Sequence, residues 1–226
     1  MDEQHEAEQR APLSRARVLR AGMELADERG LDALSMRALG RSLGVEAMSL
    51  YNHVANKDDL LDGMVDLVIG EIDVPHPDEA WKPALRRRAS SSRITYARHP
   101  WARRLIHTRA SSGPARLHAF EATIGCLRRA GFSHELTVYA LSTLDAYVDG
   151  FGTQRLDVAA ADVPDDVAMA EAIARWLPAA QYPYLSALIH EHVLRGGYDE
   201  EASFAFGLDL VLDGLEARLS EPSLTR

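Results

Sequence analysis

The segment from Ser35 to His53, SMRALGRSLGVEAMSLYNH, constrains the fold of this chain more than any other. Apolar Met36 and Leu39 precede the turn Leu43-Gly44-Val45, and a second stretch of helical spacing begins at Glu46. Two short helices joined by a tight turn that contains glycine form a helix-turn-helix, whose second helix enters the major groove of DNA. Because a helix this short is unstable alone, neighbouring helices must support it.

Helical spacing of apolar residues continues along the chain, and no stretch alternates apolar and polar residues as a strand does. Ser14, Ser35 and Asn56 are suited to cap helices, and Gly30 and Gly131 to end them. The sequence therefore predicts an all-α protein. We expect helices at about 15–29, 36–42, 46–52, 57–72, 79–97, 101–109, 114–130, 134–155, 165–176, 183–194 and 199–219.

The run Val74-Pro75-His76-Pro77-Asp78 interrupts the helical pattern, because proline lacks an amide donor and restricts the residue before it. We predict a domain boundary there. Residues 1–13 are expected to be a mobile tail, residues 14–73 a helix-turn-helix domain, and residues 74–226 a ligand-binding and dimerisation domain. A loop is expected at 157–164.

Composition excludes several classes of protein. The single cysteine, Cys126, permits no intrachain disulfide, no stretch approaches the roughly 18 apolar residues of a membrane span, and the N-terminus carries four acids before residue 10. We expect a cytoplasmic protein without a membrane partner. No phosphate-binding glycine loop or nucleophile elbow is present, and His190 and His192 are spaced wrongly for one metal ion. The sequence therefore predicts no enzyme, no cofactor and no metal site.

The net charge of −9 hides an uneven distribution of charge. Residues 58–81 hold eight acids and no base, residues 82–129 hold twelve bases and one acid, and residues 130–226 hold five bases and sixteen acids. One interpretation is that the last two blocks face each other across packed helices or between subunits. The alternative is that the arginine-rich block binds an anion or a nucleic acid. Composition alone does not separate these two interpretations.

The stretch 31–63 closely resembles the DNA-binding domain of TetR-family transcriptional regulators. The matching features, in order, are Gly30-Leu31, Ser35-Met36-Arg37, Leu39, Leu43-Gly44-Val45, Leu50-Tyr51-x-His53-Val54, Asn56-Lys57 and Leu60-Leu61. Residues 79–219 resemble, more weakly, the C-terminal domain of the tetracycline-repressor branch. Gly131-Phe132 and Tyr139-Ala140-Leu141-Ser142 carry that second resemblance.

The resemblance implies a role in DNA binding for nine residues. Phosphates, or a neighbouring base, are implied for Ser35 and Arg37, and phosphates for Tyr51, His53 and Lys57. Base reading is implied for Ala47, Met48 and Ser49, with Asn52 on the same outer side. Ala47 and Met48 are apolar, so they can read only a thymine methyl or the shape of the duplex. Tetracycline-responsive members usually carry a polar reader at the position of Ala47, which puts their operator sequence in doubt here.

The C-terminal part is expected to bind a small-molecule effector and a second copy of the chain. The resemblance implies a four-helix bundle between subunits, formed by the helices near 134–155 and 199–219. A homodimer also suits two half-sites on DNA. Structural core is the alternative role for each candidate pocket residue. These candidates are Trp101, Leu105, His107, Phe120, Ile124, Tyr147, Phe151 and Gln154.

We therefore predict a dimeric, ligand-responsive regulator, most often a repressor in this family, that binds a palindromic double-stranded DNA operator. The alternative is a small-molecule binding protein of the same fold whose DNA binding is weak or lost, an interpretation motivated by the apolar Ala47-Met48 face. A third hypothesis is nonspecific nucleic-acid binding by the block from Arg86 to Arg129.

Overall fold

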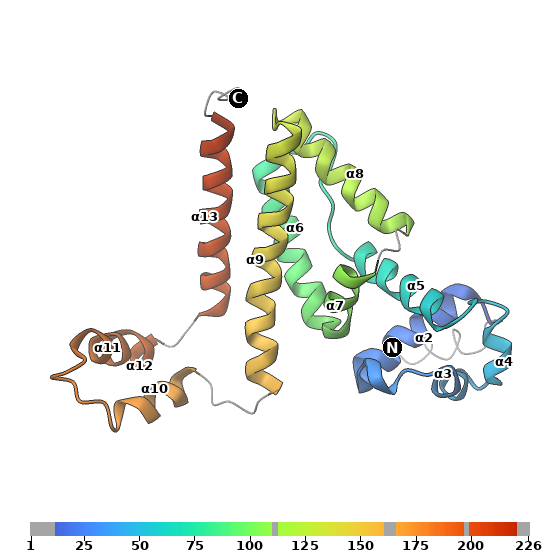
Figure 1. The fold of residues 1–226 in the computed structure, drawn as a ribbon, viewed down its shortest axis with the longest axis horizontal. Helices are drawn as coiled ribbons and strands as arrows, with labels where there is room; N and C mark the ends of the chain where they lie inside the picture. Colours follow the sequence, from blue (N-terminus) through green and yellow to red (C-terminus); the bar gives the residue numbers. More distant parts are fainter. Residues whose placement is uncertain (1–11, 110–112, 161–165, 197–198, 221–226) are drawn as a thin grey trace. The chain divides into compact units, whose positions relative to one another are not determined.

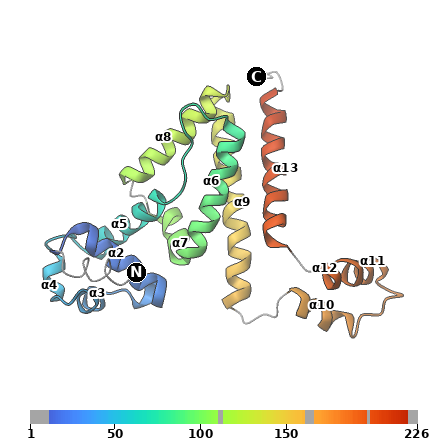
Figure 2. The same ribbon diagram turned by 180° about the vertical axis from the view of Figure 1, so that it is seen from behind.

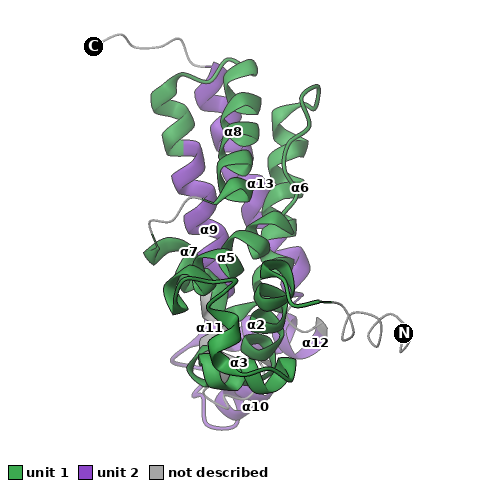
Figure 3. Ribbon diagram, turned by 90° about the vertical axis from the view of Figure 1, so that its right-hand side faces the viewer, with its two compact units in different colours: residues 1–139 green, residues 140–226 purple. Residues whose placement is uncertain are grey.

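The computed structural model describes residues 12–109, 113–160, 166–196 and 199–220, with side chains for all of these except 153–160, 166 and 196. Every regular element in this part of the chain is helical, which confirms the predicted all-α class (Figure 1). The chain divides into two compact units, residues 1–139 and residues 140–226 (Figure 3). None of the described helices is both long enough and apolar enough to cross a membrane.

The predicted N-terminal helices are present almost residue for residue. They are α2 (Arg15–Arg29), the 3-10 turn η1 (Leu31–Ala33), α3 (Met36–Leu43), α4 (Ala47–Leu50) and α5 (Lys57–Gly70). The oxygen of the Ser14 side chain accepts from the Arg17 amide at 3.3 Å, and that of Ser35 accepts from the Ala38 amide at 3.2 Å. These contacts confirm two of the predicted caps. Recognition helix α4 is shorter than expected, and only turns follow it at 51–53.

Three further helices belong to the first unit: α6 (Trp81–Arg98), α7 (Pro100–Thr108) and α8 (Pro114–Arg129). The run from Val74 to Asp78 forms no helix, as the prolines predict. Even so, the compact unit does not end there, because α5 packs against both α7 and α8. Helices α7 and α8 lie beside α5 (Figures 1 and 2). The helices that follow the linker thereby join the helix-turn-helix element in one unit, whose far boundary lies at Tyr139.

The remaining helices are α9 (His134–Ala160), α10 (Asp166–Ala174), α11 (Pro183–Leu188), the π-helical η2 (Ile189–Val193), α12 (Leu194–Gly196) and α13 (Glu200–Ser220). Two sequence predictions need correction. Residues 157–160, expected in a loop, continue α9, and 161–164 lie outside the described residues. The single helix expected at 183–194 is instead three segments, because residues 189–193 take the wider π-helical turn.

The core of the first unit lies between α2, α5 and α7. Its fully buried members include Val18, Leu39, Leu50, Leu60 and Met64. Glycine lets α2 and α5 approach closely, since a Cβ on Gly63 would lie 2.7 Å from Leu19 Cδ2. The side chain of Leu19 on α2 therefore packs directly against the backbone of α5 at Gly63.

Gly40 sets the tight join between α3 and α4. The Val45 amide donates to the Gly40 carbonyl at 2.9 Å, and Gly44 turns the chain with a φ of 68°. A Cβ on Gly40 would lie 2.8 Å from the Val45 carbonyl oxygen and 3.2 Å from the Ala47 amide nitrogen. Those atoms are backbone and cannot rotate away, so only glycine fits between the two helices of the motif.

We predict that Gly40→Ala reduces the free energy of unfolding by about 1–3 kcal/mol, because α4 must move away from α3. Thermal or urea denaturation followed by circular dichroism measures the loss. Gly70→Ala is the matched control, since its Cβ would meet only Ala115 Cβ at 3.6 Å. Equal stability of the two variants would contradict this explanation of Gly40.

Candidate nucleic-acid interface

Helix α4 is held by the side chains on one side and exposes those on the other. Leu50 and Val54 are 0% and 1% exposed and anchor the helix to the core. Met48 is 75% exposed and Tyr51 44% exposed. Asn52 is exposed as well, whereas Ala47, Ser49 and His53 are half-buried. The residues predicted to read bases therefore lie on the side of α4 that does not contribute to the core.

Two of the residues predicted to contact phosphate lie at the N-terminal end of α3. Ser35 and Arg37 are both exposed. The Ser35 oxygen already caps the helix by accepting a bond, and its hydroxyl hydrogen remains able to donate. A helix N-terminus also presents partial positive charge, so this end of α3 suits an anion.

Lys57 has a structural contact that the sequence did not predict. Its Nζ donates to the Leu34 carbonyl at 2.7 Å, across 23 residues of chain. Leu34 directly precedes the Ser35 cap, so Lys57 ties the start of α5 to the start of α3. An ammonium group has three donors, and contact with a phosphate is therefore compatible with this bond.

Arg15 binds the chain just after α4, at His53, and the first turn of α5, at Asp59. Its guanidinium donates to the His53 carbonyl at 3.0 Å and to both oxygens of Asp59, at 2.6 and 2.8 Å. Asp59 also accepts from the Ala55 amide at 2.8 Å. The hydrogen bond from Arg15, with that of Ala55, lowers the pKa of Asp59 from 3.8 to about 2. No local pattern indicates this role of Arg15, since its partners lie 38 and 44 residues away.

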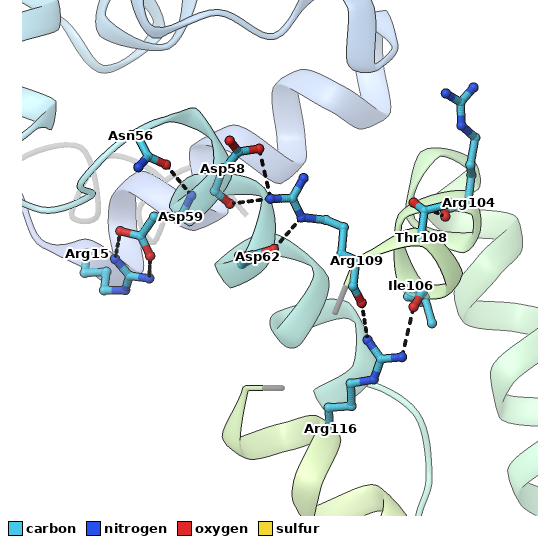
Figure 4. A network of polar contacts seen from close by, with 10 residues as sticks. All are labelled: Arg15, Asn56, Asp58, Asp59, Asp62, Arg104, Ile106, Thr108, Arg109 and Arg116. Carbon is cyan, nitrogen blue, oxygen red and sulfur yellow. Dashed lines mark hydrogen bonds and ion pairs between the residues drawn. The ribbon is translucent and has the colours of Figure 1, made fainter. Parts of the chain in front are cut away.

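A second arginine joins α5 to the end of α7, as Figure 4 shows. Arg109 donates to the carboxylate of Asp58 at 3.0 Å and to that of Asp62. These bonds raise the pKa of Arg109. Arg116, on α8, donates in turn to the carbonyls of Arg109 and Ile106 at 3.2 and 2.9 Å. The first turn of α5 is thus connected by side chains to both α7 and α8.

Acids in block 58–81 pair with arginines of block 82–129. Arg87 binds Glu79 at 2.5 Å, and Arg98 binds Glu71 at 3.2 Å, in addition to the pairs of Arg109. The sequence had favoured the acidic block 130–226 as the partner. For these three arginines the partners lie instead within the first unit, which reduces the charge left for a nonspecific nucleic-acid surface.

Glu46 is a candidate that the sequence left out. It is exposed at the N-cap of α4 and makes no side-chain capping bond. A carboxylate at this end of a recognition helix can accept a hydrogen bond from a cytosine amino group. Its position directly before Ala47, a predicted base-reading residue, could have indicated this role from the sequence.

The residues predicted to line an effector pocket are distributed between the two units. In the first unit, Trp101 is buried, with its indole N–H donating to Asp27 at 2.6 Å, and Leu105 packs against the core. His107 and Phe120 are exposed, and Ile124 is half-buried. For Trp101 the observed contacts are those of structural core, which was the alternative role for each candidate.

Two other pocket candidates belong to the second unit. The Tyr147 hydroxyl donates to the Phe204 carbonyl at 2.7 Å, and the rings of Phe151 and Phe204 meet edge to face at 5.2 Å. The side chain of Gln154 lies outside the described residues. These aromatic contacts join α9 to α13 within the unit.

A groove of about 460 Å³ lies elsewhere, between α2 and α3. None of the eight pocket candidates lines it. Its walls include Leu25, Leu43, Arg17 and Glu28. Within the part of the chain that the structure describes, no three His, Cys, Asp or Glu side chains are grouped so as to hold a metal ion. Burial raises the pKa of the Cys126 thiol, as expected for a cysteine that serves as a small apolar side chain.

Comparison with known families gives two matches. Residues 18–64 match the family described as "Bacterial regulatory proteins, tetR family". Residues 74–219 match the "Tetracyclin repressor-like, C-terminal domain". The first match contains α3, α4 and the exposed side chains described above, and the second spans α6 to α13 apart from its last residue.

Relatives of similar length carry both parts. The HTH-type transcriptional repressor DrrR1 of Streptomyces coeruleorubidus is 31% identical over 91% of this chain and 78% of its own length. The tetracycline repressor protein class G of Vibrio anguillarum is 30% identical over 90% of this chain and 94% of its own length. The Streptomyces coelicolor TetR family protein ActR, solved in complex with actinorhodin, is 30% identical with a TM-score of 0.75, over 93% of this chain and all of that one.

The paired charges of Arg15 and Asp59 predict an acid-sensitive contribution to stability. Because folding lowers the pKa of Asp59 to about 2, the contribution is complete above 3.8 and is lost as the pH falls through about 2. Asp59→Asn should reduce stability at neutral pH by about 0.5–1 kcal/mol, the range for a pair this exposed to solvent.

Melting temperatures of wild type and Asp59→Asn, measured from about pH 7 down to about pH 2, test the sign. The difference in melting temperature between the two proteins should disappear toward the acidic end of this range. Asp32→Asn is the control, because Asp32 is exposed in η1. A gap that stays constant with pH would show that charge at position 59 is not the cause.

Proposed function

The chain belongs to the TetR family of bacterial regulatory proteins, and we propose that it works as a dimeric repressor that holds a palindromic operator until a small-molecule effector binds. The observation that carries the proposal is the arrangement of α4. Its buried Leu50 and the buried Val54 that follows it fix the helix, while Met48 of the helix and the C-cap residue Tyr51 are exposed. A short helix supported in this way and open on one side is suited to enter a major groove.

Base recognition is proposed to depend mainly on Met48 and Glu46. Met48 is apolar, so its contact with bases is limited to a thymine methyl group and the shape of the groove. Glu46 adds a carboxylate at the N-terminal end of the same helix. This pair favours an operator in which a thymine lies close to a cytosine in each half-site.

Phosphate binding is proposed for Ser35, Arg37, Tyr51, His53 and Lys57. A hydroxyl, a fixed charge and a helix N-terminus are ordinary partners of the DNA backbone. Only Arg37 and Lys57 carry permanent positive charge among these five. Because few cations contact DNA in each subunit, the salt dependence of binding should be modest for a dimer.

The effector is proposed to act on α5 through the network around Arg109. Arg109, directly after α7, binds Asp58 and Asp62 of α5, and Asp58 is only one residue beyond Lys57 (Figure 4). A ligand that favours another position of residues 105–109 would therefore shift the start of α5. Such coupling requires that the ligand bind the two arrangements with different affinity.

The effector itself is proposed to be a small organic molecule. ActR was solved with actinorhodin, and a TetR variant of Acinetobacter baumannii AYE, with 26% identity and a TM-score of 0.68 over 95% of this chain and 98% of that one, was solved with minocycline. Within the first unit, Leu105, His107, Phe120 and Ile124 remain proposed contacts. Both compounds are suitable first probes in a thermal-shift assay of the purified protein.

Dimerisation is proposed to use the exposed apolar side of α13 with that of α9. Phe204, Leu208 and Leu212 face the interior of the second unit. Phe206 and Leu210, one helical turn apart, are instead 68% and 60% exposed. Exposed apolar side chains in such a row are typical of a subunit interface.

We predict that Arg37→Gln weakens operator binding by about 5- to 30-fold and lowers the salt slope by about 1, because one phosphate contact is lost. The operator is first isolated by selection from genomic DNA, and affinity is then measured by fluorescence anisotropy at several salt concentrations.

Arg29→Gln is the matched control for that measurement. Arg29 is exposed at the C-terminal end of α2, whereas α4 lies near the N-terminal end of that helix. It should bind as wild type does. If no DNA is recovered and wild type binds no duplex with sequence preference, the chain is a ligand-binding protein of this fold and the proposed operator role fails.

The double substitution Phe206→Glu with Leu210→Glu should convert the dimer to a monomer, because burying two carboxylates against apolar side chains is unfavourable. Analytical ultracentrifugation measures the mass, and circular dichroism checks that the helices remain. Leu117→Glu, which places the same charge at an exposed leucine of α8, should leave the dimer intact. A double variant that stays dimeric would move the interface away from α13.

A further inference from the structure

His99 lies buried between two carboxylates at the junction of α6 and α7. Only 8% of the residue is exposed. Its Nδ1 is 2.8 Å from Oδ1 of Asp27, on α2, and its Nε2 is 3.3 Å from Oε2 of Glu71, which caps α5. The ring therefore connects three parts of the first unit that are far apart in sequence: the ends of α2 and α5, and the start of α7.

The number of protons on this ring decides how many of these contacts it makes. A carboxylate only accepts hydrogen bonds, so each contact requires an N–H from the ring. A neutral imidazole has one N–H, whereas an imidazolium has two. Asp27 and Glu71 can therefore both be bound at once only by the doubly protonated ring.

Trp101 and Arg98 add contacts to the two carboxylates that His99 joins. The Trp101 indole N–H donates to Asp27 at 2.6 Å, and Arg98 binds Glu71 at 3.2 Å. Asp27, Glu71 and Arg98 are the charged groups whose contacts with this cluster are seen. Trp101 and Arg98 each hold one of the two carboxylates, and of these three residues His99 is the one that contacts both.

Helices α2 and α5 are joined at both of their ends. At the N-terminal ends, Arg15 binds Asp59 and the carbonyl of His53, next to the recognition helix. At the C-terminal ends, Asp27 and Glu71 meet on His99. Since Arg15 and Asp27 lie 12 residues apart on α2 and an α-helix rises about 1.5 Å per residue, roughly 18 Å separates the two junctions. A change at His99 therefore alters the far end of the same pair of helices that orients α4.

We propose that His99 is a positioning residue for operator binding, and that its protonated ring holds α2, α5 and α7 in the arrangement that fits DNA. The inference rests on the proposed function. A neutral ring has one N–H and can donate to only one of the two carboxylates, so loss of the second ring proton at higher pH weakens the junction. Operator affinity accordingly falls as the pH rises, in a manner that depends on His99.

The test compares operator affinity of the full-length protein at pH values from about 6 to about 8.5, the range in which histidine charge changes. His99→Gln should bind about 10-fold more weakly than wild type at the acidic end and should lose much of the pH dependence. His118→Gln, which removes an exposed histidine of α8, is the matched control and should retain the wild-type profile.

Glu71→Gln distinguishes a positioning role from simple packing. The amide of glutamine can donate to Nε2 while Nδ1–H donates to Asp27, so a neutral ring makes both contacts. This variant should bind the operator as tightly as wild type does at the acidic end of the pH range. It should keep that affinity at the alkaline end, where wild type binds more weakly. His53 at the DNA surface contributes its own pH dependence, which is common to all the proteins compared.

The outcomes separate this inference from the proposed function. Wild type that binds no operator at any pH refutes the function. Wild type that binds, together with a His99→Gln profile that matches it in affinity and slope, refutes the role of His99 alone. If His99→Gln is unfolded by circular dichroism, the Glu71→Gln profile decides, and a wild-type slope in that variant overturns the inference.

Discussion

The burial of Leu50 and Val54 is the constraint on which the rest of the DNA-binding element depends. Helix α4 has four residues and is too short to form on its own. It exists because these two side chains enter the core, because Gly40 admits the Val45 carbonyl, and because Arg15 holds the chain after His53. Gly40 belongs to α3 and Arg15 to α2, so the exposed surface of α4 depends on the other helices of the unit.

Helix α5 serves as the centre of this unit, and its acids explain the distribution of charge. Asp59 faces an arginine of α2, while Asp58 and Asp62 face Arg109 after α7. These carboxylates are therefore paired with arginines, which reduces the free acidic charge that would repel DNA. A net charge of −9 is in this way compatible with a local surface at Ser35 and Arg37 that binds phosphate.

Much of the fold could be predicted from local sequence, and much less of the site. Caps such as Ser14 and Asn56 and stops such as Gly44 act within one helical turn, so the bounds of α2, α3 and α5 were predicted well. The bond from Lys57 to Leu34 and the contacts of His99 join residues 23 to 72 positions apart. Those pairings depend on how the helices pack, and no local pattern contains them.

By itself, the sequence determined that the chain is helical, where its first helices begin, and that Met48 and Asn52 are exposed. It did so because caps, glycine turns and the helical period are properties of neighbouring residues. Only the tertiary structure decided that Trp101 belongs to the core, that acids of block 58–81 face Arg87, Arg98 and Arg109, and that His99 closes the pair α2 and α5. Burial and charge pairing depend on helices from distant parts of the chain, so they are defined only once those helices are packed together.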